Sequence, residues 1–115
     1  MMDGKSGCVV VLTTLEGSAD AHSIASILVT ERLAACVNVL GEMDSVYRWK
    51  GSVESARERQ MMIKTTAERL PEVEARVRAL HPYELPEFIV LQASAVEAYA
   101  RWVDESVIGP PSGGG

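Results

Sequence analysis

The chain has 115 residues, of which 47% are hydrophobic and 23% are charged, and its formal net charge is -5. A chain of this length is expected to form one domain around a single core. The negative charge argues against a nucleic-acid binder. Phosphate recognition depends on clustered lysine and arginine, whereas the basic residues here alternate with acidic ones.

The folded domain is predicted to span residues 8–108, with flexible ends at 1–7 and 109–115. The opening "MMDGKSG" lacks the apolar segment of a signal peptide, and no apolar run approaches the roughly 20 residues of a membrane span. The tail "GPPSGGG" has nothing to bury. Two cysteines, Cys8 and Cys36, are too few for a disulfide framework. We therefore expect a cytoplasmic protein that binds no membrane.

The first predicted strand is "CVVVLTT", residues 8–14. Its nearly continuous run of β-branched residues is typical of a central strand that is buried on both faces. Turn and helix-start residues follow in "LEGSAD". An amphipathic helix is then predicted over about 19–35, because Ile24, Leu28 and Leu33 recur at helical spacing.

The segment 36–66 is predicted to form a long hairpin that turns at Lys50-Gly51, where glycine accommodates the positive φ of a two-residue turn. If Trp49 faces Ser52, Glu42 lies opposite Arg59 and Asp44 lies opposite Arg57. Two opposite-charge pairs on one face favour this register, and a slip of one residue would separate both. A bulge near Gly41 would shift the register at the base.

A second amphipathic helix is predicted over about 67–80, with Pro71 tolerated in its first turn and with Glu74 and Arg78 paired on one face. Pro82 disfavours helical geometry at His81 and ends the helix there. "FIVLQA", residues 88–93, is predicted to be a strand. A last helix follows, with Val96, Tyr99 and Val103 at helical spacing.

The predicted order βαββαβα corresponds to an α+β, ferredoxin-like βαββαβ sandwich with an extended β-hairpin and a C-terminal helix. Right-handed crossovers place the first and third strands in the middle of the sheet, with the helices on one face.

The hairpin is too long for its own sheet. Each arm of about 14 residues spans about 45 Å, so something like 20 Å projects beyond the seven-residue first strand. The projection carries Tyr47 and Trp49, and an isolated ribbon of two strands is marginal in water. We therefore expect a closed homo-oligomer whose interface includes these two aromatic residues.

Five segments, in order, resemble the CutA family of divalent-cation tolerance proteins: "ERLAACVNVL", "SVYRWKGSVE", "MMIKTT", "HPYELPEFIVL" and "YARWV". The resemblance covers about residues 9–107. It implies a ferredoxin-like core assembled as a trimer, whose assembly is similar to that of the nitrogen-regulatory signal proteins. It also implies a role in tolerance to copper and other divalent metals.

Metal binding in the family is associated with cysteines and with the histidine of the corner motif, so the resemblance implies Cys36 and His81 as ligands of Cu²⁺ or another divalent cation. Glu84 could add a hard oxygen ligand. The first strand ends in Thr13-Thr14, where some relatives carry a cysteine, so a site with several thiolates in one subunit is not expected. The ligands of such a site have to come from more than one chain.

Each candidate also has a structural interpretation. Cys36 can be a small buried residue, and His81 can simply end its helix between prolines, so that the corner is first a turn and second a site. His22 is expected to be exposed.

A second functional hypothesis is a signalling or small-molecule-sensing module, with Lys64, Tyr83, Glu84 and Glu87 lining a cleft between subunits for an anionic ligand. A scaffold for a protein partner is a third. The sequence has no Ser-His-Asp arrangement, no phosphate-binding glycine loop and no HExxH motif, so we expect no enzyme and no organic cofactor.

Overall fold

The computed structural model describes residues 7–17, 19–81 and 83–109, and their elements follow the predicted order. They are β1 (Cys8–Glu16), α1 (Ala21–Thr30), β2 (Cys36–Trp49), β3 (Ser52–Thr66), the 3₁₀ turn η2 (Ala67–Arg69), α2 (Leu70–Leu80), β4 (Ile89–Gln92) and α3 (Glu97–Ser106). Most of the two predicted flexible ends lies outside the described residues.

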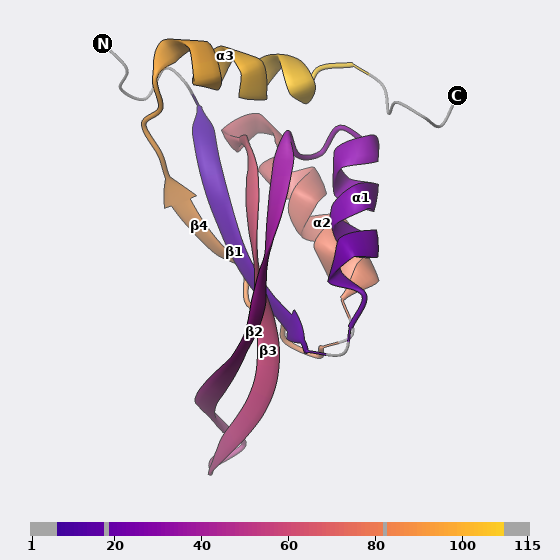
Figure 1. The fold of residues 1–115 in the computed structure, drawn as a ribbon, viewed down its shortest axis with the longest axis vertical. Helices are drawn as coiled ribbons and strands as arrows, with labels where there is room; N and C mark the ends of the chain where they lie inside the picture. Colours follow the sequence, from indigo (N-terminus) through magenta and orange to yellow (C-terminus); the bar gives the residue numbers. More distant parts are fainter. Residues whose placement is uncertain (1–6, 18, 82, 110–115) are drawn as a thin grey trace.

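The four strands form one antiparallel sheet in the order β2-β3-β1-β4. β1 and β3 lie in the middle, as the right-handed crossovers predicted, so the ferredoxin-like topology is confirmed. Figure 1 shows the long β2–β3 hairpin leaving the body of the molecule, while α3 crosses the opposite end.

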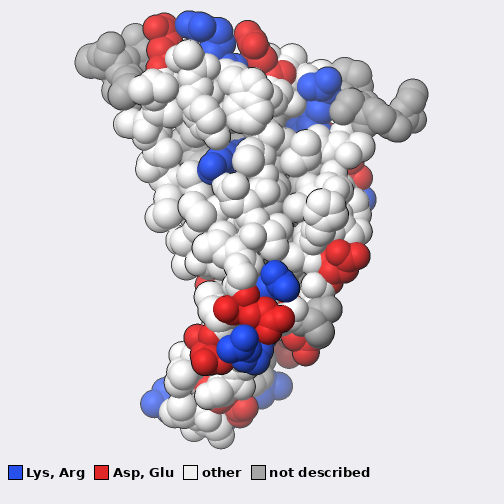
Figure 2. Space-filling view, viewed as in Figure 1, with Lys and Arg blue, Asp and Glu red and all other residues white. Residues whose placement is uncertain are grey.

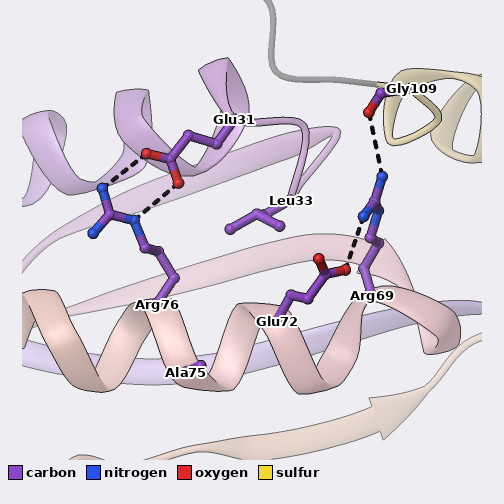
Figure 3. Close-up of a pocket in the computed structure, with 7 residues that line it drawn as sticks. All are labelled: Glu31, Leu33, Arg69, Glu72, Ala75, Arg76 and Gly109. Atoms are coloured by element: carbon purple, nitrogen blue, oxygen red, sulfur yellow. Dashed lines mark hydrogen bonds and ion pairs between the residues drawn. The ribbon is translucent and has the colours of Figure 1, made fainter.

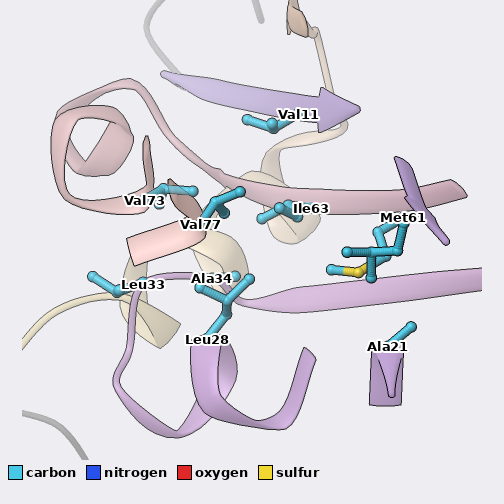
Figure 4. Close-up of a cluster of buried hydrophobic side chains, with 10 residues drawn as sticks. Val11, Ala21, Leu28, Leu33, Ala34, Met61, Ile63, Val73 and Val77 are labelled. Atoms are coloured by element: carbon cyan, nitrogen blue, oxygen red, sulfur yellow. The ribbon is translucent and has the colours of Figure 1, made fainter. Parts of the chain in front are cut away.

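The main core lies between the sheet and the helices α1 and α2. Val11 on β1 faces its cross-strand partner Ile63 on β3, and both are fully buried together with Leu28 of α1 and Val73 of α2. Figure 4 shows these side chains converging from the sheet and both helices. A smaller cluster joins Cys8 and Ala35 to Val103 and Val107, so it is α3 that covers the end of the sheet where β1 begins.

The opposite face of the sheet has no helix along most of its length. On β4, all four residues from Ile89 to Gln92 are exposed. Figure 2 shows a broad surface with few charged residues over the body of the molecule, with charges gathered near α3 and along the hairpin. Three of the four β4 residues, Ile89, Val90 and Leu91, are large apolar side chains, and contiguous exposed side chains of this kind mark contacts with other molecules.

The predicted register of the hairpin is confirmed. Trp49 faces Ser52 across a turn in which Lys50 and Gly51 both have positive φ. Arg57 lies opposite Asp44, and its guanidinium donates to that carboxylate at 2.9 Å and to Glu42 at 3.3 Å.

The predicted bulge at the base of the hairpin is also present. The register shifts between Val39 and Glu42, so Leu40 and Gly41 together occupy the place opposite one residue of β3.

The far part of the hairpin pairs with no third strand of the described chain. Pairing between β1 and β3 ends at Glu16 and Glu58, so residues 52–57 and the facing part of β2 extend about 20 Å further. Val46 and Val53 on this ribbon are 71% and 67% exposed.

Two predicted boundaries were wrong in extent. The first helix ends at Thr30 rather than near residue 35, because Arg32 adopts a φ of 60° and the amides of Leu33 and Ala34 both turn back to the carbonyl of Leu28. The second helix is preceded by the 3₁₀ turn η2, and Pro71 lies in the first turn of α2 as expected.

Candidate functional site

His81 lies where α2 ends, and its backbone is extended. Its ring is buried, and both ring nitrogens are engaged. Nε2 donates to the carbonyl of Thr14 on β1, and Nδ1 accepts the amide of Tyr83 at 3.1 Å. This geometry corresponds to the neutral tautomer with the proton on Nε2. The ring thus joins α2, β1 and the corner loop, and a metal ion would have to displace one of these hydrogen bonds.

Cys36 and Lys64 are cross-strand partners at the other end of the sheet, next to Val10 of β1. Both are half-buried. Four positions of β3, about 13 Å, separate Lys64 from Gln60, the partner of Thr14. Cys36 and His81 therefore do not meet within one chain. A site that used both would need a second chain.

The remaining predicted residues line one cavity. It has a volume of about 970 Å³ and lies between the inner side of the hairpin and the loop 83–87. Tyr47 and Trp49 line it from β2, and Tyr83, Glu84 and Glu87 line it from the loop. The sequence grouped these residues only by motif, and the fold brings them to one place. Lys64 is not part of the lining.

The sequence analysis missed two residues on the floor of this cavity, Glu58 and Gln60. Glu58 is 8% exposed and accepts the Tyr83 hydroxyl at 2.8 Å, and the side-chain amide of Gln60 donates to Glu87 at 2.9 Å. The signal was available in the alternation of β3, where residues 58, 60, 62 and 64 share one face. The burial of a glutamate could not be read from that pattern.

The floor of the cavity changes the acidity of its side chains. Burial raises the pKa of the Glu87 carboxyl above its ordinary value, and the negative charge of Glu58 raises it further, whereas the hydrogen bond from Gln60 lowers it. Burial also raises the pKa of the Tyr83 hydroxyl, and the hydrogen bond to Glu58 acts in the same direction. Tyr83 therefore remains a hydrogen-bond donor at neutral pH.

The described residues contain no preformed metal cluster, because no group of three or more histidine, cysteine, aspartate or glutamate side chains is arranged to hold an ion. A metal site in one chain would need at least that many ligands. The predicted ligands Cys36, His81 and Glu84 thus do not form one three-ligand group in the single chain.

A second hollow lies between α2 and the loop that follows α1, and it offers no open anion site. Arg76 holds the carboxylate of Glu31 with two hydrogen bonds of 2.8 and 2.9 Å (Figure 3). Arg69 is bound to Glu72 and to the carbonyl of Val107. Both guanidinium groups are already paired, and Arg69 instead fixes the end of α3.

A family model described as "CutA1 divalent ion tolerance protein" matches residues 9–106. The chain belongs to the CutA family. The divalent-cation tolerance protein CutA of Thermus thermophilus is 43% identical over 98 residues, which make up 84% of this chain and 95% of the relative. The match covers nearly all of the described fold.

Solved structures of CutA proteins agree with this assignment. The structure of the Thermus thermophilus protein has a TM-score of 0.84 at 41% identity and covers 88% of this chain and 99% of its own. The structure of the Archaeoglobus fulgidus protein has a TM-score of 0.83 at 31% identity, with coverages of 88% and 99%. The fold and family inferred from the five segments are confirmed.

The names of these relatives differ in cellular location. The Archaeoglobus fulgidus structure is called periplasmic, and a CutA protein of Arabidopsis thaliana, 35% identical over 99 residues, is called chloroplastic. The match covers 85% of this chain but 54% of the Arabidopsis protein.

None of the described helices has the length and apolar character needed to cross a membrane. The family model and the Thermus thermophilus relative are named for tolerance to divalent ions and are not named as enzymes.

Proposed function

We propose that the protein acts in divalent-metal tolerance as a cytoplasmic homotrimer without catalytic activity, which binds Cu²⁺ or a similar ion weakly at clefts between subunits. The observation that carries the proposal is the family match over residues 9–106, since the family is named for divalent ions. The proposed ligands are Cys36, His81 and Glu84, contributed by more than one chain.

The hairpin supports the assembly. Val46 and Val53 on the unpaired ribbon are mostly exposed, and the strand edge of β4 is open. Edges and ribbons of this kind pair with another chain unless something covers them. A closed ring of three copies would cover both without forming a filament.

Sedimentation equilibrium tests the assembly. We expect three times the mass of one chain at micromolar concentration. Replacing Tyr47 and Trp49 together by alanine is expected to shift the protein toward single chains. Tyr99→Ala is the matched control, because Tyr99 is similarly exposed but lies on α3. A folded wild-type monomer would contradict the assembly.

Calorimetric titration with Cu²⁺ and Zn²⁺ tests the metal site. Cys36→Ala and Glu84→Gln are each expected to weaken copper binding, and His81→Ala is expected to do so if the ring can exchange a hydrogen bond for the ion. His22→Ala is the control, because His22 is exposed on α1. Unchanged copper binding in all three variants would show that none of the three residues is a copper ligand.

The alternative function is a small-molecule-sensing module that uses the cavity between the hairpin and the loop 83–87. Its size falls in the range of ligand sites. The predicted anionic ligand fits the lining poorly, because the charged residues in that lining are acidic. A thermal-shift screen with nucleotides and other anionic metabolites is expected to give no stabilisation. Stabilisation by one of them would support the predicted anionic ligand.

A further inference from the structure

The helix α3 is attached to the sheet separately from the rest of the fold. Figure 1 shows it lying across the end of the sheet that is remote from the hairpin. None of its residues belongs to the main core cluster, which joins β1 and β3 to α1 and α2. Val103 of α3 and Val107, directly after it, instead close a second and smaller cluster over Cys8 and Ala35. Because α3 is the last element of the described chain, it can leave the sheet without breaking another element.

Two arginine side chains hold the C-terminal end of α3. Arg69 of η2 donates to the carbonyl of Val107 from two of its nitrogens, at 2.6 and 2.9 Å. Arg32, from the loop after α1, donates to the carbonyl of Ser106 at 3.1 Å. The last carbonyls of a helix have no partner inside the helix and carry its partial negative charge. Two positively charged donors from separate segments therefore hold this end in place.

The N-terminal end of α3 has a weaker attachment. Its N-cap residue is Val96, whose side chain makes no capping hydrogen bond and is exposed. The segment before it is joined to the sheet where the amide of Ala93 donates to the carbonyl of Cys8 at 3.1 Å. Elements with few buried apolar side chains open at a lower free energy than the core of the same protein. The small cluster and the two arginines thus carry most of the attachment of α3.

Cys8 is a buried side chain beneath α3, and it is 4% exposed. Burial raises the pKa of its thiol, whereas the positive charge of Lys64 lowers it. Lys64 is the cross-strand partner of Val10, so Lys64 and Cys8 lie on the same face of the sheet. If α3 leaves, the effect of burial is lost and the effect of Lys64 remains. The thiolate, which is the reactive form of cysteine, is then favoured.

We propose that α3 is a lid that opens and closes as a unit over the end of the sheet, that the hydrogen bonds of Arg32 and Arg69 hold it closed, and that its opening exposes the thiol of Cys8. The main core and the hairpin stay folded while the lid is open. This motion goes beyond the proposed function, because it requires neither a metal ion nor the proposed metal ligands.

Thiol labelling of the full-length assembled protein with 5,5′-dithiobis(2-nitrobenzoate) tests the proposal. The Cys36→Ser variant is the parent, because it leaves Cys8 as the one cysteine of the chain. Its labelling rate is expected to depend little on low concentrations of urea, since a local opening exposes little surface. Arg69→Gln and Arg32→Gln, each made in this parent, should raise the rate by about tenfold, because each removes charged hydrogen bonds made only in the closed form.

Arg76→Gln in the same parent is the matched control. Arg76 lines the same hollow as Arg69, but it binds the carboxylate of Glu31 and makes no hydrogen bond to α3. Its labelling rate should equal that of the parent. The rate constant should also be the same at low and high protein concentration, because the lid opens within one chain and not by separation of subunits.

Three results would overturn the proposal. The first is labelling of Cys8 only at the rate of global unfolding, with the full dependence on urea that unfolding shows. The second is an equal effect of Arg69→Gln and Arg76→Gln. The third is a rate that falls as the protein concentration rises, which would mean that dissociation uncovers Cys8. All of these measurements use variants that lack Cys36, so they leave the proposed metal site untouched and the two proposals fail separately.

Discussion

The ring of His81 is bonded to the carbonyl of Thr14, so the C-terminal end of α2 is tied to the middle strand of the sheet. The second ring nitrogen holds the amide of Tyr83. The corner is therefore first a structural joint, and it sets the position of the loop whose side chains line the cavity.

Replacing His81 by alanine is expected to lower the free energy of unfolding by roughly 2 kcal/mol, because two hydrogen bonds are lost and the Thr14 carbonyl is left unpaired in a buried place. Urea denaturation followed by circular dichroism measures the change. His22→Ala should have almost no effect, since His22 is exposed. Equal stability of the two variants would show that the joint contributes nothing.

The same substitution at two buried threonines is expected to have opposite effects. Thr13 is 1% exposed and its hydroxyl has no partner in the described chain, so Thr13→Val should raise stability by about 1 kcal/mol. Thr65 is fully buried and its hydroxyl donates to the Leu33 carbonyl at 2.7 Å, so Thr65→Val should lower stability by about 1–3 kcal/mol. Thermal unfolding of the two variants gives the signs directly. A loss of stability in both would indicate that the Thr13 hydroxyl is bonded in solution.

The turn of the hairpin is expected to be sensitive to a side chain at Gly51. Its φ of 85° is strained for any other residue, so Gly51→Ala should lower stability by about 1 kcal/mol or more. Gly41→Ala is the matched control: this glycine also lies on the hairpin, has no positive φ and has open space around its Cβ position. Thermal unfolding compares them, and the prediction fails if Gly41→Ala is the more damaging change.

Glu87 is expected to make stability depend on pH. Its pKa is raised in the folded chain, so the folded state keeps this proton at pH values where the unfolded chain has lost it. The resulting stabilisation is complete below the ordinary value of 4.5 and is lost as the pH rises through the folded pKa. Glu87→Gln should therefore gain stability over the wild type as the pH increases toward neutral.

Urea midpoints measured between about pH 4 and about pH 8 test this dependence. Glu97→Gln, at an exposed position of α3, should follow the wild-type curve. A Glu87→Gln curve parallel to that of the wild type would mean that folding does not raise the pKa of this carboxyl.

Much of the fold could be predicted from the sequence because its strongest signals are local. The Lys50-Gly51 turn and the opposed charges predicted the register of the hairpin. The lengths of its two paired arms then predicted that the hairpin extends beyond the first strand. The end of α1 was missed because it depends on Arg32 in a positive-φ conformation, which an arginine adopts only in a particular tertiary context.

The candidate site was less accessible to sequence reasoning. The corner motif pointed to Tyr83, Glu84 and Glu87, but the cavity exists only because the loop stands opposite the hairpin. The burial of Glu58 arises from that meeting of two distant segments. Lys64 appeared equally suitable for the cleft by its residue type, and its position four places further along β3 separates it from the others.

The single inserted position at Leu40 and Gly41 determines more than a local bend. On one side of it the even-numbered residues of β2 share a face with Glu58, and on the other side the odd-numbered ones do. Removing one of these two residues would leave every pair from Glu42 to the turn unchanged, because the extra position lies on β2 alone, and Tyr47 and Trp49 would stay on the face of Glu58. The bulge thus lets this arm be one residue longer than the part of β3 that it pairs with, while the side chains on both sides of the bulge keep their faces.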